Sequence, residues 1–439
     1  MSATNDKHAM RPSRRAFLGA SAALGLSGSS LARPALESLS RETAVPQDGG
    51  GPPALVAIYL RGGADILNMI IPCEDPTYAL ARPGIGIGEA DGRLALDDEW
   101  ALHPALAPLL PLYKEGLLAP LVNVGSPHTT RSHFDAQDFM EFAAPGNRSV
   151  RSGWLNRYLE VTSQVRARRS RGASQDGEFR ALGMQGLLPR SLRGDYPVLA
   201  VPEDAGSADS NAALDRFEKF YGAGQGSGGM DERPVEGGED GSAVVASGKV
   251  TIETLRRLQE IVGTGEQRDY GYPKSGFGSG LSRIGQVIAS GAGLEVAGID
   301  IGGWDHHANQ GGTDGRHAQM LGDLAQSLAA FARQQGSRME RTMVLVMSEF
   351  GRTVNENGSN GTDHGHGGGM LLLGGGVEGG RVLGEWRGLR SDQLHQGRDL
   401  PVTTDFRDVF AEVLRNLFDF KTPKEFFPDY RPGRLKLFG

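Results

Sequence analysis

Residues 54–65 read ALVAIYLRGGAD, and this stretch decides the fold. Ala54 to Leu60 is a continuous apolar run of strand length, and Asp65 follows it after the tight turn at Gly62 and Gly63. A run that is apolar on both faces predicts a strand buried on both sides, as in the parallel sheets of α/β proteins. An acidic residue at the exit of such a strand lies at the edge of the sheet where these proteins bind their ligands.

The same alternation of apolar runs and helical patterns continues along the chain. Strand-like runs occupy 117–124, 196–201, 294–301, 342–347 and 370–373, and helical patterns occupy 103–113, 151–171, 251–262, 280–290, 315–335 and 405–418, with a further helix beginning at Ser132. Strands that alternate with helices indicate a mostly parallel sheet covered by helices on both faces. We therefore expect an α/β protein with a three-layer, mostly parallel sheet.

Changes in amino-acid composition along the sequence divide the chain into regions. We expect a signal peptide at 1–32, a flexible tether at 33–53, an α/β core domain at 54–149 and 281–439, and an insertion or cap at 150–280. Within the insertion, residues 222–248 are dense in Gly, Ser, Asp and Glu. Such a composition cannot bury a core, so it predicts a disordered loop.

The amino terminus has the pattern of a bacterial twin-arginine export signal. Arg14 and Arg15 precede Phe17, Leu18 and a weakly apolar stretch rich in Ala, Gly and Ser that ends at Ala32. Paired arginines before such a stretch and a small-residue cleavage site are typical of this signal, which we expect to be cut after Ala32. The alternative is a basic, disordered amino terminus. The expected partner is the twin-arginine translocase, and the expected location is periplasmic or extracellular.

Composition excludes several classes of partner. The formal net charge of the 439 residues is −7, without a long basic block, which argues against nucleic acid because phosphate neutralisation requires clustered Lys and Arg. No segment approaches the roughly 18 consecutive apolar residues that a stable membrane span requires. The chain has a single cysteine, Cys73, so no intramolecular disulfide forms even in an oxidising compartment.

Two short Gly-rich stretches hold four of the ten histidines: GGWDHH at 302–307 and GTDHGHGG at 361–368. Imidazole and carboxylate are ligands for divalent metals, and glycines let the backbone turn tightly around an ion. The alternative is surface loops that are merely rich in His and Gly. The Asp-x-His spacing favours His307 over the adjacent His306, which we expect to support the site. The expected metal ligands are Asp65, Asp305, His307, Glu349, Asp363, His364 and His366, and the metal is a divalent ion among Zn, Mn, Fe, Mg and Ca.

A candidate nucleophile, Ser132, lies at the predicted start of a helix. A helix N-terminus offers free N–H groups and a positive dipole end, which favour an alkoxide and an anionic substrate. The alternative is that Ser132 caps the helix and does nothing more. His133 is a candidate metal ligand or proton donor. Arg131 and Arg352 are candidates to hold an oxyanion, because guanidinium groups match phosphate and sulfate geometry.

Several motifs together resemble one protein family. They are RGGAD at 61–65, RSHF at 131–134, GWLNR at 153–157, GGWDHH at 302–307, SEFGRT at 348–353 and GTDHGHG at 361–367, and they resemble the bacterial DUF1501 family over about 54–420. That family is largely uncharacterised, usually carries twin-arginine signals, and is regarded as related to the alkaline phosphatase and sulfatase superfamily. The resemblance implies an alkaline-phosphatase-like fold.

The resemblance also implies roles for individual residues. Asp65 looks like the first metal-binding Asp of the superfamily and Ser132 like its nucleophile. Asp305 and His307 look like one later metal-binding pair, and 363–366 like the last. The chain departs from the superfamily at Glu349, which with the following Phe replaces the usual Asp-His pair, so a carboxylate is kept and an imidazole is lost.

Three functions follow as hypotheses. The first is an exported metal-dependent hydrolase of phosphate or sulfate esters, acting on a small or polymeric anionic substrate. The second is a non-enzymatic envelope protein with a degenerate metal-binding or ligand-binding site, which the missing Asp-His pair motivates. The third is a redox-metal site built from the same Asp and His clusters.

Overall fold

The computed structural model describes residues 51–169, 179–202, 215, 252, 254–263 and 268–438. Its centre is a sheet whose strands are β1 Ala54–Arg61, β5 Leu118–Gly125, β6 Ala181–Gly183, β7 Leu199–Ala200, β8 Val296–Gly302, β9 Thr342–Met347, β10 Gly368–Gly374 and β11 Thr404–Asp405. A small antiparallel sheet consists of β2 Ile70–Pro72, β3 Leu94–Ala95 and β4 Trp100–Leu102.

The helices connect and cover these strands. The α-helices are α3 Ile66–Met69, α4 Pro76–Ala81, α5 Leu110–Lys114, α6 His133–Glu141, α7 Trp154–Arg169, α10 Gly276–Ser290, α11 Arg316–Gln335 and α12 Phe406–Phe418. Shorter 3-10 turns are η2 Pro104–Leu109, η3 Arg190–Leu192, η5 Gly336–Arg341 and η6 Ser391–Gln393. Residues 254–263 are also helical.

The first strand, β1, lies in the middle of the central sheet. The strand order is β11-β5-β10-β9-β1-β8-β6-β7, and β1 pairs in parallel with both β8 and β9. Among the described strands of this sheet only β10 runs against its neighbours, pairing antiparallel with β5 and β9. The expected mostly parallel α/β sheet is therefore confirmed, with one reversed strand inside it.

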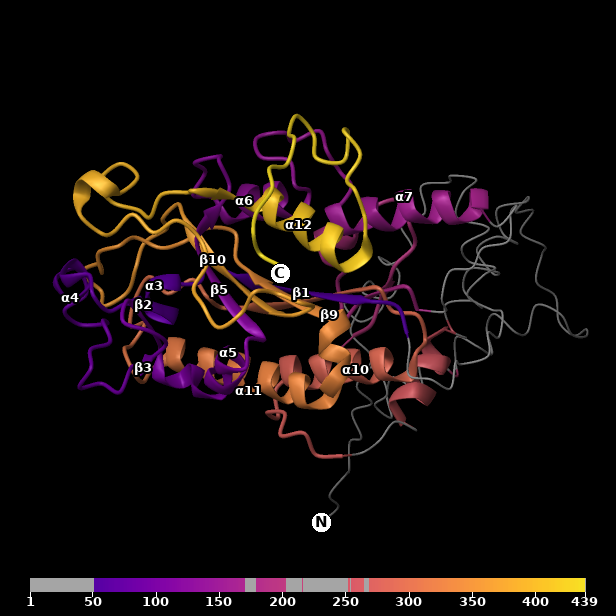
Figure 1. The fold of residues 1–439 in the computed structure, drawn as a ribbon, viewed down its shortest axis with the longest axis horizontal. Helices are drawn as coiled ribbons and strands as arrows, with labels where there is room; N and C mark the ends of the chain where they lie inside the picture. Colours follow the sequence, from indigo (N-terminus) through magenta and orange to yellow (C-terminus); the bar gives the residue numbers. More distant parts are fainter. Residues whose placement is uncertain are drawn as a thin grey trace, which may run out of the picture.

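Helices lie on both faces of the sheet, which makes three layers (Figure 1). Helices α5, α10 and α11 lie on one face, and α6, α7 and α12 lie on the other. The alternation of side chains along β1 matches these layers, since Val56 and Ile58 join the core cluster of α10 and α11, while Leu55 and Ala57 join that of α7 and α12. All four side chains are buried, as the unbroken apolar run predicts.

Part of the range predicted as an insertion belongs to the sheet. Strand β6 pairs with β8, and β7 pairs with β6, although both lie within 150–280. Helix α7 packs Trp154 and Leu155 into the core of the same face as α12. Strand β7 lies within the run predicted at 196–201, whereas β6 has only three residues, too few to show a periodic pattern. The boundary at 150 therefore does not separate a cap from the core.

Some expectations fall outside the described residues. The signal peptide at 1–32, most of the tether at 33–53 and the loop at 222–248 lie there. Within the described parts, no helix combines the length and apolar character needed to cross a membrane.

Candidate metal centre

The sheet topology brings the two His-rich loops together. The loop at 302–307 follows β8, and Glu349 follows β9, so both leave the carboxyl edge of parallel strands that flank β1. The loop at 361–367 precedes β10, and because β10 is reversed, its amino end lies at that same edge. Helix α6 contributes His133 as its first residue.

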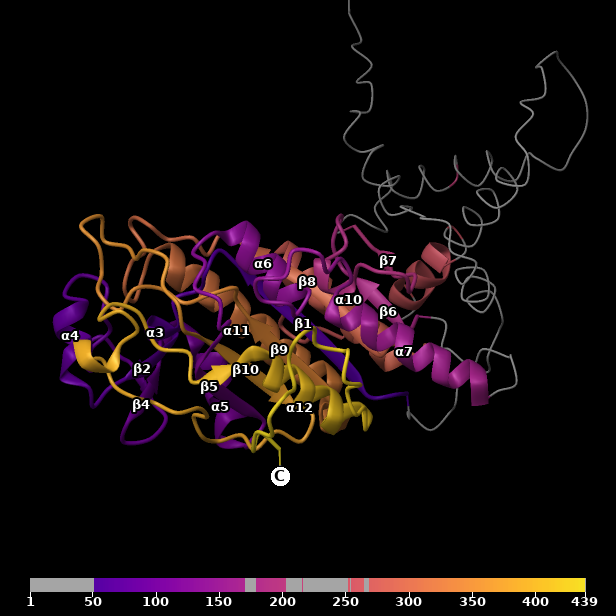
Figure 2. The ribbon, with the colours of Figure 1, turned by 90° about the horizontal axis from the view of Figure 1, so that it is seen from above.

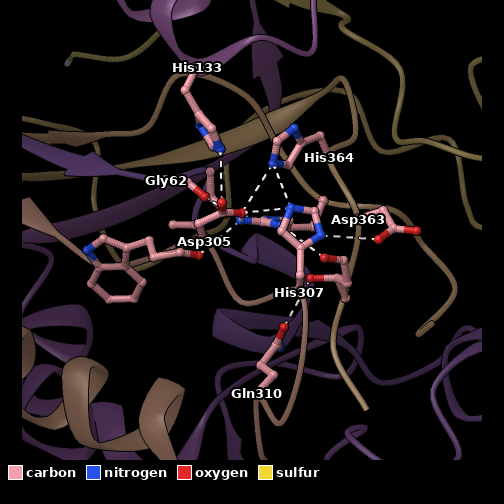
Figure 3. A network of polar contacts seen from close by, with 12 residues as sticks. Gly62, His133, Asp305, His307, Gln310, Asp363 and His364 are labelled. Atoms are coloured by element: carbon pink, nitrogen blue, oxygen red, sulfur yellow. Dashed lines mark hydrogen bonds and ion pairs between the residues drawn. The ribbon is translucent and has the colours of Figure 1, made fainter. Parts of the chain in front are cut away.

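Three histidines converge on the carboxylate of Asp305 (Figure 3). The Nε2 atoms of His307 and His364 lie 3.0 and 3.1 Å from Asp305 Oδ1. His133 Nε2 lies 3.3 Å from Asp305 Oδ2. These side chains come from α6, the loop after β8 and the loop before β10, so the cluster joins segments far apart in the sequence.

The opposite nitrogen of each ring has its own partner. His133 Nδ1 lies 2.8 Å from Glu349 Oε1, His364 Nδ1 lies 2.8 Å from the carbonyl oxygen of Arg131, and His307 Nδ1 lies 3.2 Å from Asp363 Oδ1. Each of these partners is an acceptor, as is the Asp305 carboxylate at Nε2, so a neutral ring can donate to only one of the two. A metal at Nε2 requires the tautomer that carries its N–H at Nδ1. The lone pair of every ring then points at Asp305.

This arrangement concentrates acceptors in one place. His307 Nε2 and His364 Nε2 lie only 2.9 Å apart, and both lie close to a carboxylate oxygen. Lone pairs facing each other and an anion repel unless a cation lies between them. His133 Nε2 is buried without a hydrogen-bond partner among the described residues. The residues therefore fit a bound cation, whether a proton or a metal ion.

The donor set matches a transition metal. His133, Asp305 and His364 each offer one ligand atom, and these atoms lie within 4.8 Å of one another. His307 Nε2 lies beside this group, in contact with His364. Imidazole nitrogens with one carboxylate oxygen suit Zn, Fe, Mn or Ni better than Ca or Mg, which prefer oxygen ligands.

A buried arginine keeps Asp305 ionised. Arg352 Nη2 lies 2.5 Å from Asp305 Oδ1, and this guanidinium also donates to the carbonyls of Gly63 and Thr362 at 2.6 and 2.9 Å. Burial opposes ionisation of Asp305, but the hydrogen bond and charge of Arg352, together with His364 and His307, outweigh it and lower the pKa of Asp305 to about 2. Burial lowers the pKa of His364, which favours its neutral, metal-binding form.

Glu349 is fully buried and contacts His133 at Nδ1, the ring nitrogen that faces away from Asp305. Its Oε1 accepts from His133, from Gln137 Nε2 at 2.9 Å and from the backbone N–H of Gly62 at 2.9 Å. Burial opposes its ionisation, but these donors hold the pKa of Glu349 below its usual range. The hydrogen bond with Glu349 raises the pKa of His133. A carboxylate that orients a histidine in this way tunes a metal ligand.

Glycines let the loops approach the site closely. A Cβ added at Gly361 would lie 2.5 Å from the carbonyl carbon of His307, and one at Gly365 would lie 2.5 Å from that of Arg352. Both contacts are with backbone, which has no freedom to move aside. Contact between loops thus requires glycine at 361 and 365.

Asp65 does not join the group around Asp305. Its carboxylate forms a buried ion pair with Arg82, with Oδ2 to Nη1 at 2.5 Å and Oδ1 to Nη2 at 3.0 Å, and Oδ2 also accepts from Gln310 Nε2 at 2.6 Å. The structure therefore gives Asp65 a cationic side chain as its partner in place of the expected metal. The sequence pattern did not identify Arg82 as a partner of Asp65.

Two histidines of the expected site also lie apart from the group. His366 packs on His395 with ring centroids 4.3 Å apart, and burial lowers its pKa to about 4. His306 is buried beside His317, with ring centroids 5.5 Å apart. His307 thus contacts Asp305, whereas His306 packs on His317 and His366 packs on His395.

The residues expected to handle the substrate have different surroundings. Arg352 is buried and donates to carbonyls and to Asp305. Arg131 forms an ion pair with Asp399 at 2.6 Å. Ser132 is the exposed N-cap residue of α6, but its side chain makes no capping hydrogen bond. Its hydroxyl therefore has no structural partner in the helix terminus.

Comparison with known proteins supports the family resemblance. Residues 258–425 match a family described as "Protein of unknown function (DUF1501)", which confirms the resemblance over that range. The matched range contains Asp305, His307, Glu349, Asp363 and His364. A search of curated proteins found no match.

Three solved structures share similarity with the chain. The C-terminal periplasmic domain of EcEptC from Escherichia coli, in complex with Zn, aligns with 9% identity over 75% of each chain at a TM-score of 0.33. A 2-O GAG sulfatase aligns with 10% identity over 86% of this chain and 72% of that one, at a TM-score of 0.33. The PsFucS1 sulfatase from Pseudoalteromonas sp. aligns with 12% identity over 93% of this chain and 72% of that one, at a TM-score of 0.33. Similarity at this level does not transfer activity or substrate.

Proposed function

We propose that the protein is an exported, metal-dependent hydrolase of phosphate or sulfate esters. The observation that carries the proposal is the convergence of three imidazole Nε2 atoms on the carboxylate of Asp305, each ring held by an acceptor at Nδ1. A divalent ion bound there supplies Lewis acidity toward an ester oxygen. His133, Asp305, His307 and His364 would hold that ion, and Glu349 and Asp363 would orient two of the histidines.

Ser132 has the properties of a nucleophile at this site. It lies between Arg131, whose carbonyl accepts from His364, and His133. Its hydroxyl is exposed and free of a capping bond, so an ester at the metal centre can approach it. The N-terminus of the nine-residue helix α6 favours negative charge on the attacking oxygen. An in-line attack by the Ser132 oxygen would form a covalent ester and release the alcohol.

A second candidate function is metal or ligand binding without turnover. It is favoured by the engagement of both arginines expected to hold an oxyanion, since Arg352 is buried against Asp305 and Arg131 is paired with Asp399. Asp65 is likewise paired with Arg82. A protein of this kind keeps the metal but lacks the groups that stabilise charge in the transition state.

The export part of the proposal rests on the sequence of the amino terminus. The pair Arg14 and Arg15 followed by a weakly apolar stretch motivates transport by the twin-arginine translocase to the periplasm or outside the cell. Substituting both arginines by lysine should retain the precursor in the cytoplasm, as measured by fractionation. Unchanged export of that variant would contradict the route.

The metal content of the purified full chain tests the centre itself. We expect about one equivalent of a transition metal by plasma mass spectrometry, and removal by a chelator should abolish hydrolysis of aryl phosphate or aryl sulfate esters. Turnover that tracks metal content supports the hydrolase. Bound metal without turnover of mono- and diesters or sulfates supports the binding function, and no metal after titration contradicts both.

The Ser132→Ala variant separates the two roles of this residue. Because its side chain makes no capping bond, we expect stability to fall by less than about 0.5 kcal/mol in urea denaturation, below the usual cost of losing a cap. Loss of a nucleophile should lower kcat by a factor on the order of 1,000 or more. Thr129→Ala, at an exposed residue of the same loop, is the control. Unchanged kcat in Ser132→Ala would assign the attack to water.

A further inference from the structure

A cavity of about 370 Å³ lies among α4, β4 and the segment that leads into η6. Its walls come from 72–77, 99–100 and 386–393, and we call it the indole pocket. Helix α4 lies at the end of the molecule opposite α7 (Figure 1, Figure 2). No residue of the metal centre lines this pocket, so it needs a separate explanation.

Two tryptophans give the pocket its apolar surface. The rings of Trp100 and Trp386 meet edge to face, with centroids 5.0 Å apart and planes at 74°. Trp100 is buried, whereas Trp386 is half-buried and presents part of its indole to the pocket. Pro72 and Pro76 add rigid apolar surface beside them. Indole rings bury a large area at low entropic cost and pack well against flat, C–H-rich faces.

The remaining walls carry hydrogen-bonding groups of both kinds. Glu74 and Glu99 are exposed carboxylates that accept. Gln393 carries N–H donors, and so does Arg390, whose Nε and Nη2 also donate to Asp392 at 3.2 and 3.3 Å. Asp75 instead holds the walls together, since its carboxylate accepts from the N–H of Thr77 at 2.9 Å and from that of Leu389 at 2.8 Å. With three carboxylates and one guanidinium, the lining is net negative and repels anions.

From these features we infer that the indole pocket binds an uncharged sugar unit of an oligosaccharide. A pyranose ring combines a flat C–H face, which suits the indole of Trp386, with hydroxyls that donate to carboxylates and accept from Arg390 or Gln393. The cavity volume falls within the range of small-molecule sites. The negative lining excludes the sulfated or phosphorylated unit that the metal centre would take.

The pocket and the metal centre are joined by one stretch of chain. Residues 386–393 line the pocket, and Asp399, a few residues later, pairs with Arg131 next to the metal centre. Arg398 donates to the carbonyl of His364 at 3.2 Å. Sugar binding in the pocket does not depend on the hydrolysis proposed for the metal centre.

Titration of the metal-free full chain with cellohexaose and chitohexaose tests the inference. Two of the four tryptophans line the pocket, and Trp154 and Trp304 are fully buried elsewhere, so intrinsic fluorescence reports binding there. We expect saturable binding of at least one neutral oligosaccharide, confirmed by calorimetry. Trp386→Ala should weaken it about tenfold or more, and Trp386→Phe should restore most of the affinity.

Leu187→Ala, which removes an exposed apolar side chain away from the pocket, is the matched control and should bind as the parent does. Circular dichroism checks that each variant is folded. Absence of binding by both neutral oligosaccharides, or equal binding by Trp386→Ala, overturns the inference. The cationic hexamer of glucosamine is titrated as a third ligand. If it alone binds, and salt weakens its binding, the inference is overturned in favour of a cation site. Neither result bears on the metal centre, whose metal content is measured separately.

Discussion

Replacing Asp305 by Asn is expected to abolish stable metal binding while the protein remains folded. The carboxylate is the only anionic group on which the Nε2 atoms of His133, His307 and His364 converge within the described residues. Its loss removes both a ligand and the charge that offsets a divalent cation, so affinity should fall by more than about 100-fold. The amide oxygen of Asn can still accept from Arg352, which retains four other acceptors among backbone carbonyls.

The measurement is metal affinity by competition with a chromogenic chelator, with circular dichroism to verify the fold. Asp135→Asn is the matched control, because that carboxylate lies on α6, the helix that begins with His133, and pairs with Arg148 at the surface. Glu349→Gln should show an intermediate loss of about 10–100-fold, as expected for a group that orients a ligand. Metal affinity that is equal in the parent and in Asp305→Asn would exclude this cluster as the centre.

Replacing Arg82 by Met should destabilise the protein by about 3–5 kcal/mol, because it leaves the carboxylate of Asp65 buried without its cation. Arg82 and Asp65 are each 2% exposed. The same guanidinium donates to Asn68 Oδ1 at 2.7 Å and to the carbonyls of Thr353 and Val354 at 2.9 Å. Its removal therefore frees acceptors on two segments, 65–68 and 353–354.

Urea denaturation measures this loss, and a double variant supplies the control. Arg82→Met combined with Asp65→Leu removes both charges, so it should be more stable than Arg82→Met alone. A single variant as stable as the parent would contradict the description of Asp65 as a paired structural carboxylate. Retained metal binding in a folded double variant would show that Asp65 is not a ligand.

The same ion pair predicts sensitivity to acid. Burial by itself would raise the pKa of Asp65, but the charge of Arg82 and its hydrogen bonds hold the pKa below the usual value. A carboxyl whose pKa is lower in the folded state stabilises the fold above its unfolded pKa of about 4, and this contribution is lost as the pH falls through the folded value. Equilibrium unfolding between pH 6 and pH 2 measures it, and the double variant should lose less stability over that interval.

The long apolar runs allowed the sequence to predict the centre of the fold. The predicted run at 342–347 coincides with β9, and β1 extends one residue beyond the predicted 54–60. The predicted run at 196–201 contains β7, but β6 and β11 have only three and two residues and lie toward the sides of the sheet, where pairing with a neighbour defines them. Such short strands have no periodicity of their own, and their prediction requires knowing the neighbour.

The sequence singled out several residues of the candidate site but not the contacts between them. Asp305, His307 and His364 follow from the Gly-rich loops, and the structure places them in contact. The role of Glu349 depends on His133, which lies 216 residues away in sequence. The pairing of Asp65 with Arg82 depends on the path of the loop through α4. Contacts of this kind are set by tertiary packing, which local sequence patterns do not record.

The candidate metal ligands lie far apart in the sequence, so they are synthesised at different times. A nascent chain that ends before residue 364 lacks one imidazole of the centre, and the region matched by the family, 258–425, lacks both His133 and β1. Metal uptake at the proposed centre would therefore be a late event that requires β1, α6 and both loops in their final positions. Bound metal would thus mark the chains that have completed folding, and a purification step could select them.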